Sequence, residues 1–117
     1  MNVEDLLNFC LALPATVEDC PWAEPQYANL ITFKIGGKWY CLFDPDNRFI
    51  NLKLQPEKIQ ELIARYTGAT PAWHMNKQHW VSLKLEADIP DAVIRQLVTD
   101  AYNLVRSSLP KSIRASL

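Results

Sequence analysis

The sequence predicts one α+β domain over residues 1–117, with elements in the order α-β-β-β-α-β-β-α. The expected sheet is mostly antiparallel and five-stranded, with helices on one face. Three observations support this prediction. Apolar residues repeat with helical spacing in three segments, β-forming runs flank short turns between those segments, and 117 residues is the length of one domain. A sheet covered by helices on one face would bury all of these apolar residues.

The first helix is expected to begin after Asn2 and to end near Leu13. Asn2 is a favourable N-cap, and Asp5 follows three residues later in an arrangement like a capping box. Pro14 disfavours helical geometry at the residue before it. The apolar stripe between these limits has spacing i, i+3, i+4, i+7, i+8 and consists of Val3, Leu6, Leu7, Cys10 and Leu11. Residues 14–27 contain three prolines and should form a surface loop with room for one short strand, attached through Trp22 and Tyr27.

Residues 28–43 are predicted to form a β-hairpin around the two-residue turn Gly36-Gly37. An unbroken two-residue period then assigns each side chain to a face. The expected core face holds Ile31, Phe33, Ile35, Tyr40 and Leu42. The expected opposite face holds Thr32, Lys34, Trp39 and Cys41, with Leu30 and Phe43 at its far end. Lys34 and Trp39 should therefore be cross-strand neighbours.

The middle of the chain continues with a turn, a strand and a helix. The composition of residues 44–47, Asp-Pro-Asp-Asn, is typical of a turn, and residues 48–54 alternate as a third strand. Pro56 is expected at the start of the second helix, and Gly68 is a plausible stop. Its apolar stripe is Ile59, Leu62, Ile63 and Tyr66.

The segment from Trp73 to Trp80 reads Trp-His-Met-Asn-Lys-Gln-His-Trp and holds both histidines of the chain. A hairpin with a four-residue loop over 75–78 would place Trp73 opposite Trp80 and His74 opposite His79. The two pairs would then lie on opposite faces of the ribbon. Residues 81–85 complete the second strand of this hairpin.

The last part of the chain is predicted to be helical. Asp88, Pro90 and Asp91 should begin the third helix, and residues 110–117 should add one or two helical turns. The apolar stripe of the third helix is Ile94, Leu97, Val98, Ala101, Leu104 and Val105.

Composition argues against several classes of protein. No uninterrupted apolar run approaches the ~18 residues of a membrane-spanning helix, and residues 1–5 lack the features of a signal peptide. We therefore expect a cytoplasmic protein with no membrane association. The three cysteines contain no CxxC pair, which fits a reducing compartment and small buried side chains.

Sequence patterns for catalysis are absent as well. The chain has no GxSxG, HExxH, P-loop or GxGxxG pattern, and its cysteines and histidines are not at the spacing of zinc ligands. The expected protein is non-enzymatic, with no metal and no cofactor. Its net charge of −1 is unevenly distributed, because residues 31–85 carry eight basic residues against four acidic ones. A net charge of +4 in this middle part (eight minus four) favours an anionic partner.

The order of elements and the segment of residues 71–80 together resemble the MmcQ/YjbR family of small bacterial proteins. The shared features are Leu-Pro-Ala at residues 13–15, His-x-Asn-Lys-x-His-Trp at 74–80, and the acidic-Pro-Asp start of the last helix. The resemblance covers nearly the whole chain. It implies an α+β fold like that of secretion chaperones and CyaY-like proteins. It also implies a "double wing", in which two β-hairpins contact DNA.

The sequence therefore supports the hypothesis of a monomeric module that binds double-stranded DNA. Lysines at both hairpin tips would contact phosphates, and a tryptophan would stack on a base. The residues expected at the interface are Lys34, Lys38, Trp39, Trp73, His74, Asn76, Lys77 and His79.

Other interpretations stay open at this point. Lysines at turns also discourage edge pairing of strands, and Trp73 and Trp80 could serve as cross-strand packing. The protein could instead be an interaction domain resembling a secretion chaperone, with a protein partner bound at the acidic N-terminal third or at an apolar sheet face. A small-ligand or metal site between the hairpins is the third alternative.

Overall fold

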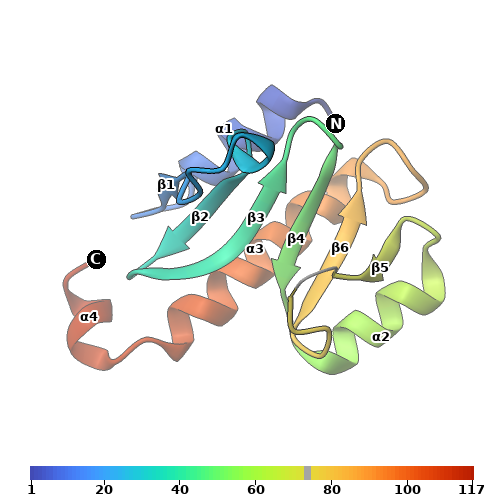
Figure 1. Ribbon diagram of the computed structural model, residues 1–117. Helices are drawn as coiled ribbons and strands as arrows, with labels where there is room; N and C mark the ends of the chain where they lie inside the picture. The colour runs from blue at the N-terminus through green and yellow to red at the C-terminus, as the bar shows by residue number, and fades with distance from the viewer. Residues whose placement is uncertain (73–74) are drawn as a thin grey trace.

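A six-stranded antiparallel sheet forms the centre of the structure, with strand order β1-β2-β3-β4-β6-β5 (Figure 1). The computed structural model describes residues 1–72 and 75–117. The elements are α1 (Val3–Ala12), β1 (Val17–Asp19), the 3₁₀ helix η1 (Pro25–Tyr27), β2 (Ile31–Ile35), β3 (Lys38–Asp44), β4 (Phe49–Lys53), α2 (Pro56–Arg65), β5 (Ala69–Pro71), β6 (Trp80–Lys84), α3 (Asp91–Ser108) and α4 (Lys111–Ala115). The predicted α+β class and element order are confirmed. The sheet has one strand more than expected, because β1 pairs with the edge of β2.

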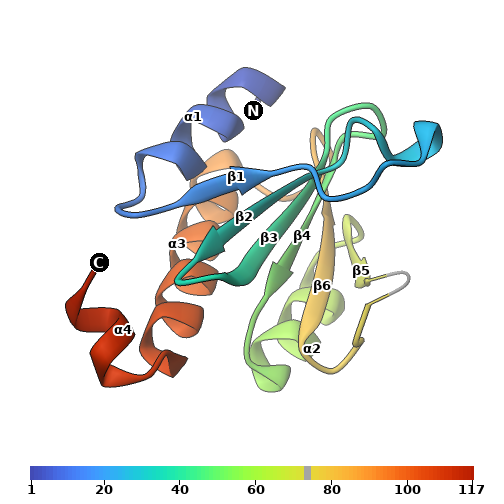
Figure 2. The ribbon, with the colours of Figure 1, turned by 60° about the vertical axis from the view of Figure 1, so that its left-hand side comes forward.

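The helices lie on one side of this sheet, as predicted. α3 packs against β3 and β4, α2 against β5, and α1 against α3. Figure 2 shows the loop that holds η1 on the opposite side of the sheet from α1 and α3. The sheet face away from the helices, which we call the open face, is therefore bordered by loops. No helix within the described ranges is long and apolar enough to cross a membrane.

Local signals in the sequence set the limits of the helices. The Asn2 side-chain oxygen accepts a hydrogen bond from the Asp5 amide at 2.7 Å, as expected of an N-cap. Pro56 and Pro90 stand at the starts of α2 and α3. The Tyr102 hydroxyl on α3 donates to the Pro14 carbonyl at 2.6 Å, so the end of α1 is fastened to α3.

A β-bulge in the β2–β3 hairpin changes the predicted faces. The pairs next to the turn, Ile35 with Lys38 and Lys34 with Trp39, have the expected register, but Phe33 then pairs with Cys41. Tyr40 is thus the extra residue, and every later position of β3 is shifted by one. The prediction was wrong for three side chains: Cys41 and Phe43 lie in the core, and Leu42 lies on the open face.

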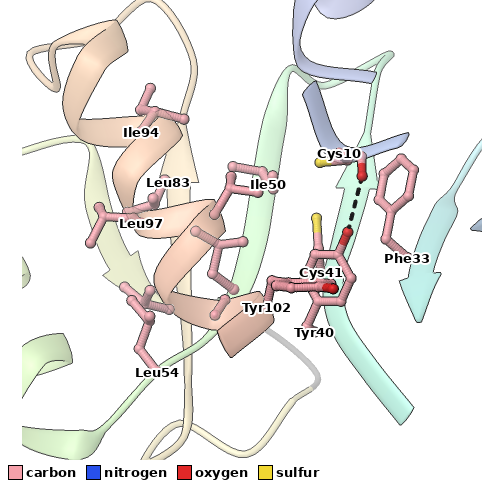
Figure 3. Close-up of a cluster of buried hydrophobic side chains, with 14 of the residues drawn as sticks. Cys10, Phe33, Tyr40, Cys41, Ile50, Leu54, Leu83, Ile94, Leu97 and Tyr102 are labelled. Carbon is pink, nitrogen blue, oxygen red and sulfur yellow. Dashed lines mark hydrogen bonds between the residues drawn. The ribbon is translucent and has the colours of Figure 1, made fainter. Parts of the chain in front are cut away.

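The core next to this bulge is aromatic and sulfur-rich (Figure 3). The Tyr40 ring meets the Tyr102 ring edge-on, with ring centroids 5.5 Å apart. The Tyr40 hydroxyl lies 3.0 Å from the Thr16 hydroxyl and donates to the Cys10 carbonyl at 3.4 Å. Burial raises the pKa of the Tyr40 hydroxyl and of the Cys41 thiol above their usual values. Cys10 and Cys41 are buried as predicted, whereas Cys20 is exposed.

A carboxylate fastens the beginning of β5. Asp88 accepts hydrogen bonds from the backbone amides of Thr67 at 2.7 Å and Gly68 at 2.8 Å. These two bonds hold the pKa of the Asp88 carboxyl below its usual value. Asp88 was expected only to precede α3, so this second role was not predicted.

Both hairpin turns lie at the same end of the sheet. This follows from the antiparallel pairing, because the starts of β3 and β6 are both at the end of the sheet where β4 finishes. At that end Gly36 has φ +58°, and a Cβ atom added there would lie 2.5 Å from Leu109 Cδ1. Gly37 has φ +80° and open space around it.

The two glycines therefore form a matched pair for mutation. Gly37→Ala should lower the free energy of unfolding by about 1–2 kcal/mol, the cost of a left-handed conformation for an L-residue. Gly36→Ala should lower it further, by about 1–3 kcal/mol, because buried Leu109 must also move. Urea denaturation of both variants measures this difference. Equal losses would show that contact with Leu109 is unimportant.

Asp88 generates a pH-dependent prediction. A carboxyl whose pKa is lowered by folding stabilises the protein above its unfolded pKa of about 3.9, and this contribution is lost as pH falls through the folded pKa. Asp88→Asn should therefore destabilise the protein at neutral pH and flatten the decline of stability below about pH 4. Urea denaturation between pH 2.5 and 7 tests this, with the exposed edge-strand variant Glu18→Gln as control.

Candidate functional site

The open face carries a row of mostly polar residues that crosses the whole sheet, and we call it the polar row. Successive strand pairs place these residues side by side, from β1 to β5: Asp19, Thr32, Leu42, Asn51, Ser82 and Thr70. Thr32 and Asn51 are buried polar residues. The Thr32 hydroxyl donates to the Asp19 carbonyl at 3.1 Å. Polar residues in the middle of a sheet usually indicate a surface with a role other than core packing.

Two further pairs, one step closer to the hairpin turns, each join a lysine to a tryptophan. Lys34 on β2 pairs with Trp39 on β3, and Lys53 on β4 pairs with Trp80 on β6. Strand alternation places Lys53 on the same face as Asn51, and Trp80 on the same face as Ser82. We call these four residues the Lys-Trp row.

Two loops border the open face at its two edges and form a groove of about 690 Å³. From one edge, Trp22 reaches over the sheet to meet the Trp39 ring at a centroid distance of 5.6 Å. From the other edge, Met75 and Asn76 overhang the face. The remaining lining residues are Gln26, Tyr27, Leu30, Leu42, Asp44, Asn47, Phe49, Asn51, Thr70, Pro71, Trp80 and Ser82. A cleft of this size with aromatic walls and a few polar groups is typical of a ligand site.

Asn51 is the most unusual residue of the groove floor. Its side chain is in the centre of the polar row and only 3% of the residue is exposed. The amide nitrogen donates to the Met75 sulfur at 3.3 Å, and a thioether is a weak acceptor. The amide oxygen is buried and has no hydrogen-bond partner among the described residues. An unpaired buried polar atom lowers the free energy of unfolding by about 1–3 kcal/mol. Stability alone therefore does not explain an asparagine at position 51.

The charges around the groove are divided between its two ends. At the end with the Lys-Trp row, the Lys34 ammonium donates to the Asp19 carboxylate at 2.8 Å. This hydrogen bond lowers the pKa of Asp19 below its usual value. At the other end Asp44 accepts two hydrogen bonds from Asn47, as expected of the predicted turn. The charge of Lys34 is therefore largely offset by Asp19, and the other end of the groove carries the carboxylate of Asp44.

The structure brings together only part of the predicted interface. Trp39 and Asn76 line the groove, and Lys34 pairs with Trp39 as expected. Lys38, Lys77 and His79 are exposed and do not line it. Asn76 also shapes the loop, because its side chain accepts from the Gln78 amide at 2.9 Å and its carbonyl accepts from the Trp80 amide at 2.9 Å.

The expected pairing of the Trp73–Trp80 segment involves Trp73 and His74, which lie outside the described residues. The described part of this hairpin ends with Pro71 opposite Val81. That register is one residue away from the one in which Trp73 would face Trp80.

The site residues that were not predicted include Trp22, Asn51, Lys53 and Trp80. Strand alternation already placed Asn51 and Lys53 on one face of β4, but the identity of the open face depended on the neighbouring strands. Trp22 was expected to attach its loop, and it does so by packing on Trp39. No group of three His, Cys, Asp or Glu side chains in residues 1–72 and 75–117 is arranged to hold a metal ion.

Comparison with known proteins adds the family. The model of the YjbR family matches residues 11–104. This chain belongs to the YjbR family. The YjbR resemblance deduced from residues 71–80 is thus confirmed. Among its relatives, YbdF of Escherichia coli O157:H7 is 41% identical over 110 residues, covering 92% of this chain and 87% of YbdF. YyaQ of Bacillus subtilis is 28% identical over 116 residues, covering 88% of this chain and 97% of YyaQ.

Solved structures of similar proteins agree with this YjbR fold. A Deinococcus radiodurans protein with the domain DUF419 has a TM-score of 0.87 and 28% identity, over 98% of this chain and 86% of that one. A Pseudomonas syringae protein has a crystal structure with a TM-score of 0.76 and 28% identity, over 90% of this chain and 99% of the other.

The unpaired oxygen of Asn51 leads to a prediction about stability. Asn51→Leu removes a buried polar group without overfilling the core, because its side chain faces the groove. The variant should raise the free energy of unfolding by about 1 kcal/mol. Urea denaturation measures the change, with Asn103→Leu on the exposed side of α3 as control. A loss of stability in Asn51→Leu alone would show that this amide supports the fold.

Proposed function

We propose that this YjbR-family chain is a non-enzymatic module that binds nucleic acid on the open face of its sheet, and that an unpaired strand is its preferred form. The observation that supports this most directly is the Lys-Trp row. It places one lysine–tryptophan pair on β2 and β3 and another on β4 and β6, and both tryptophans line the groove with aromatic walls.

Lysines paired with aromatic rings match the chemistry of a single strand. Lysines attract phosphates, and indoles stack on bases with little regard for sequence. Neighbouring strands are about 4.8 Å apart, so Lys34 and Lys53, which lie two strands apart, are separated by about 10 Å. A strand that crosses the sheet could therefore place a phosphate near each lysine and a base near each tryptophan.

The groove favours unpaired over paired bases. A base in a duplex offers its edges in the grooves, while both of its flat faces are already stacked on neighbouring bases. Trp39 is partly exposed and can stack only on a base whose face is available, whereas Trp80 is 9% exposed and offers little of its ring. Binding of double-stranded DNA through the hairpin tips stays a prediction. Lys38 and Lys77 lie at the same end of the sheet as the Lys-Trp row and would extend its basic surface.

The moderate charge of the protein also shapes the expected binding. With a net charge of −1, long-range attraction to nucleic acid is weak, so binding must depend on the local charge of the Lys-Trp row. The strand should avoid the end of the groove that holds Asp44. We therefore expect weak affinity at physiological salt and clear binding only at low salt.

A salt titration with Lys53→Gln tests the proposal. For single-stranded DNA, each phosphate contact contributes about 0.7 to the slope of log K against log salt. The wild-type protein should bind a single-stranded oligonucleotide more tightly than the matched duplex, and Lys53→Gln should reduce the salt slope by about 0.7. Fluorescence anisotropy at several salt concentrations provides both quantities.

Lys58→Gln, on the helical side of the protein, is the matched control and should leave the slope unchanged. The proposal fails if neither nucleic acid binds at low salt. Tighter binding of the duplex, or equal effects of the two lysine variants, would contradict the assignment of the open face.

A further inference from the structure

We infer that the groove is an adenine site, in which the side-chain amide of Asn51 hydrogen-bonds the edge of one unpaired adenine base. The inference builds on the proposed function, because it names the chemical group that the open face recognises. It can be tested separately from nucleic-acid binding, since a free nucleoside has no phosphate to contact.

The side-chain amide of Asn51 lacks good hydrogen-bond partners within the described residues. Within residues 1–72 and 75–117, its oxygen has no partner and its nitrogen has only a thioether partner, although the residue is almost fully buried. Buried polar groups in proteins are nearly always satisfied. An amide in this state is satisfied when a ligand supplies a donor to the oxygen and a better acceptor to the nitrogen.

The surroundings of Asn51 favour a flat aromatic ligand. The nearest side chains on its face are Leu42 and Ser82, its cross-strand neighbours. Trp22, Trp39 and Trp80 line the same groove, together with Phe49 and Met75. Such walls bind flat rings by stacking, while a single amide on the floor selects among them by hydrogen bonding.

The Asn51 amide favours adenine over guanine, because the two bases differ at the base edge that carries N7. There adenine offers an amino donor beside the N7 acceptor, whereas guanine offers two acceptors, N7 and O6. Asparagine matches the adenine pattern with both amide atoms at once. Because Asn51 is buried in this structure, the side chains that cover it, Met75 among them, must move first. The adenine amino group would then donate to Asn51 Oδ1, and N7 would accept from Asn51 Nδ2.

The position of Lys53 connects this base to a phosphate. Lys53 and Asn51 are two residues apart on β4, so their side chains leave the same face about 7 Å apart. A nucleotide spans a comparable distance between its base and its own phosphate. The same site could therefore hold adenine from a free nucleotide or from a nucleic acid strand, and the shared chemistry is the adenine base.

The experiment compares adenosine with purine riboside, which has the same ring system but no amino group. Binding to the full chain is followed by NMR shifts of backbone amides in β4 and β6. A well-made bidentate contact of asparagine with adenine corresponds to about 5- to 150-fold in affinity. Adenosine should bind the wild-type protein more tightly than purine riboside by a factor within this range.

Two variants at Asn51 and one elsewhere complete the design. In Asn51→Leu the preference for adenosine should vanish. In Asn51→Asp binding of adenosine should weaken, because a carboxylate cannot donate to N7. Asn103→Leu should behave as wild type. Equal affinity for the two nucleosides in the wild-type protein, an undiminished preference in Asn51→Leu, or no binding of adenosine up to its solubility limit would overturn the inference.

Further arms use adenosine monophosphate and single-stranded oligo(dA) to distinguish the sources of the base. Tighter binding of oligo(dA) than of the monophosphate supports a strand as the ligand. If the adenosine preference depends on Asn51 but oligo(dA) does not bind, the adenine site stands and the proposed function fails. If oligo(dA) binds equally well to wild type and Asn51→Leu, the proposed function stands and the adenine site fails.

Discussion

The extra residue in β3 is the constraint on which the two faces of the sheet depend. Because Tyr40 is inserted into the ladder, Cys41 and Phe43 turn towards the helices while Leu42 turns to the open face. A regular hairpin would place Leu42 in the core and two core side chains in the groove. The bulge also leaves the Tyr40 hydroxyl next to Thr16 and Cys10. One insertion therefore sets both the core packing and the shape of the groove.

Much of the fold could be predicted because its signals are local. Asn2, Pro14, Pro56 and Gly36-Gly37 each set a helix limit or a turn through their own backbone chemistry. The bulge could not be predicted, because it depends on how Tyr40 packs against Tyr102, 62 positions later in the chain. A short strand was allowed for within residues 14–27 but was not counted in the sheet, because β1 has only three residues and its pairing with β2 is all that defines it.

The site was predicted less well than the fold. Sequence reasoning concentrated on charged hairpin tips, because unusual residues cluster there. The structure instead gathers side chains from four strands and two loops, and residues such as Asn51 and Lys53 look ordinary within their own strand. What distinguishes Asn51 is the absence of a partner for its oxygen among the described residues, which only a three-dimensional arrangement reveals. If the groove binds adenine as proposed, stability and recognition make opposite demands on this position.

The distribution of tryptophan gives the protein a natural optical reporter. Trp22, Trp39 and Trp80 all line the groove, and of these three only Trp80, at 9% exposed, is among the buried hydrophobic residues. Indole emission responds to the polarity and stacking of its surroundings. The emission of these three indoles should therefore respond to changes on the open face. It should respond little to changes in the packing between α3 and the sheet. Occupancy of the groove can then be monitored in the unlabelled protein.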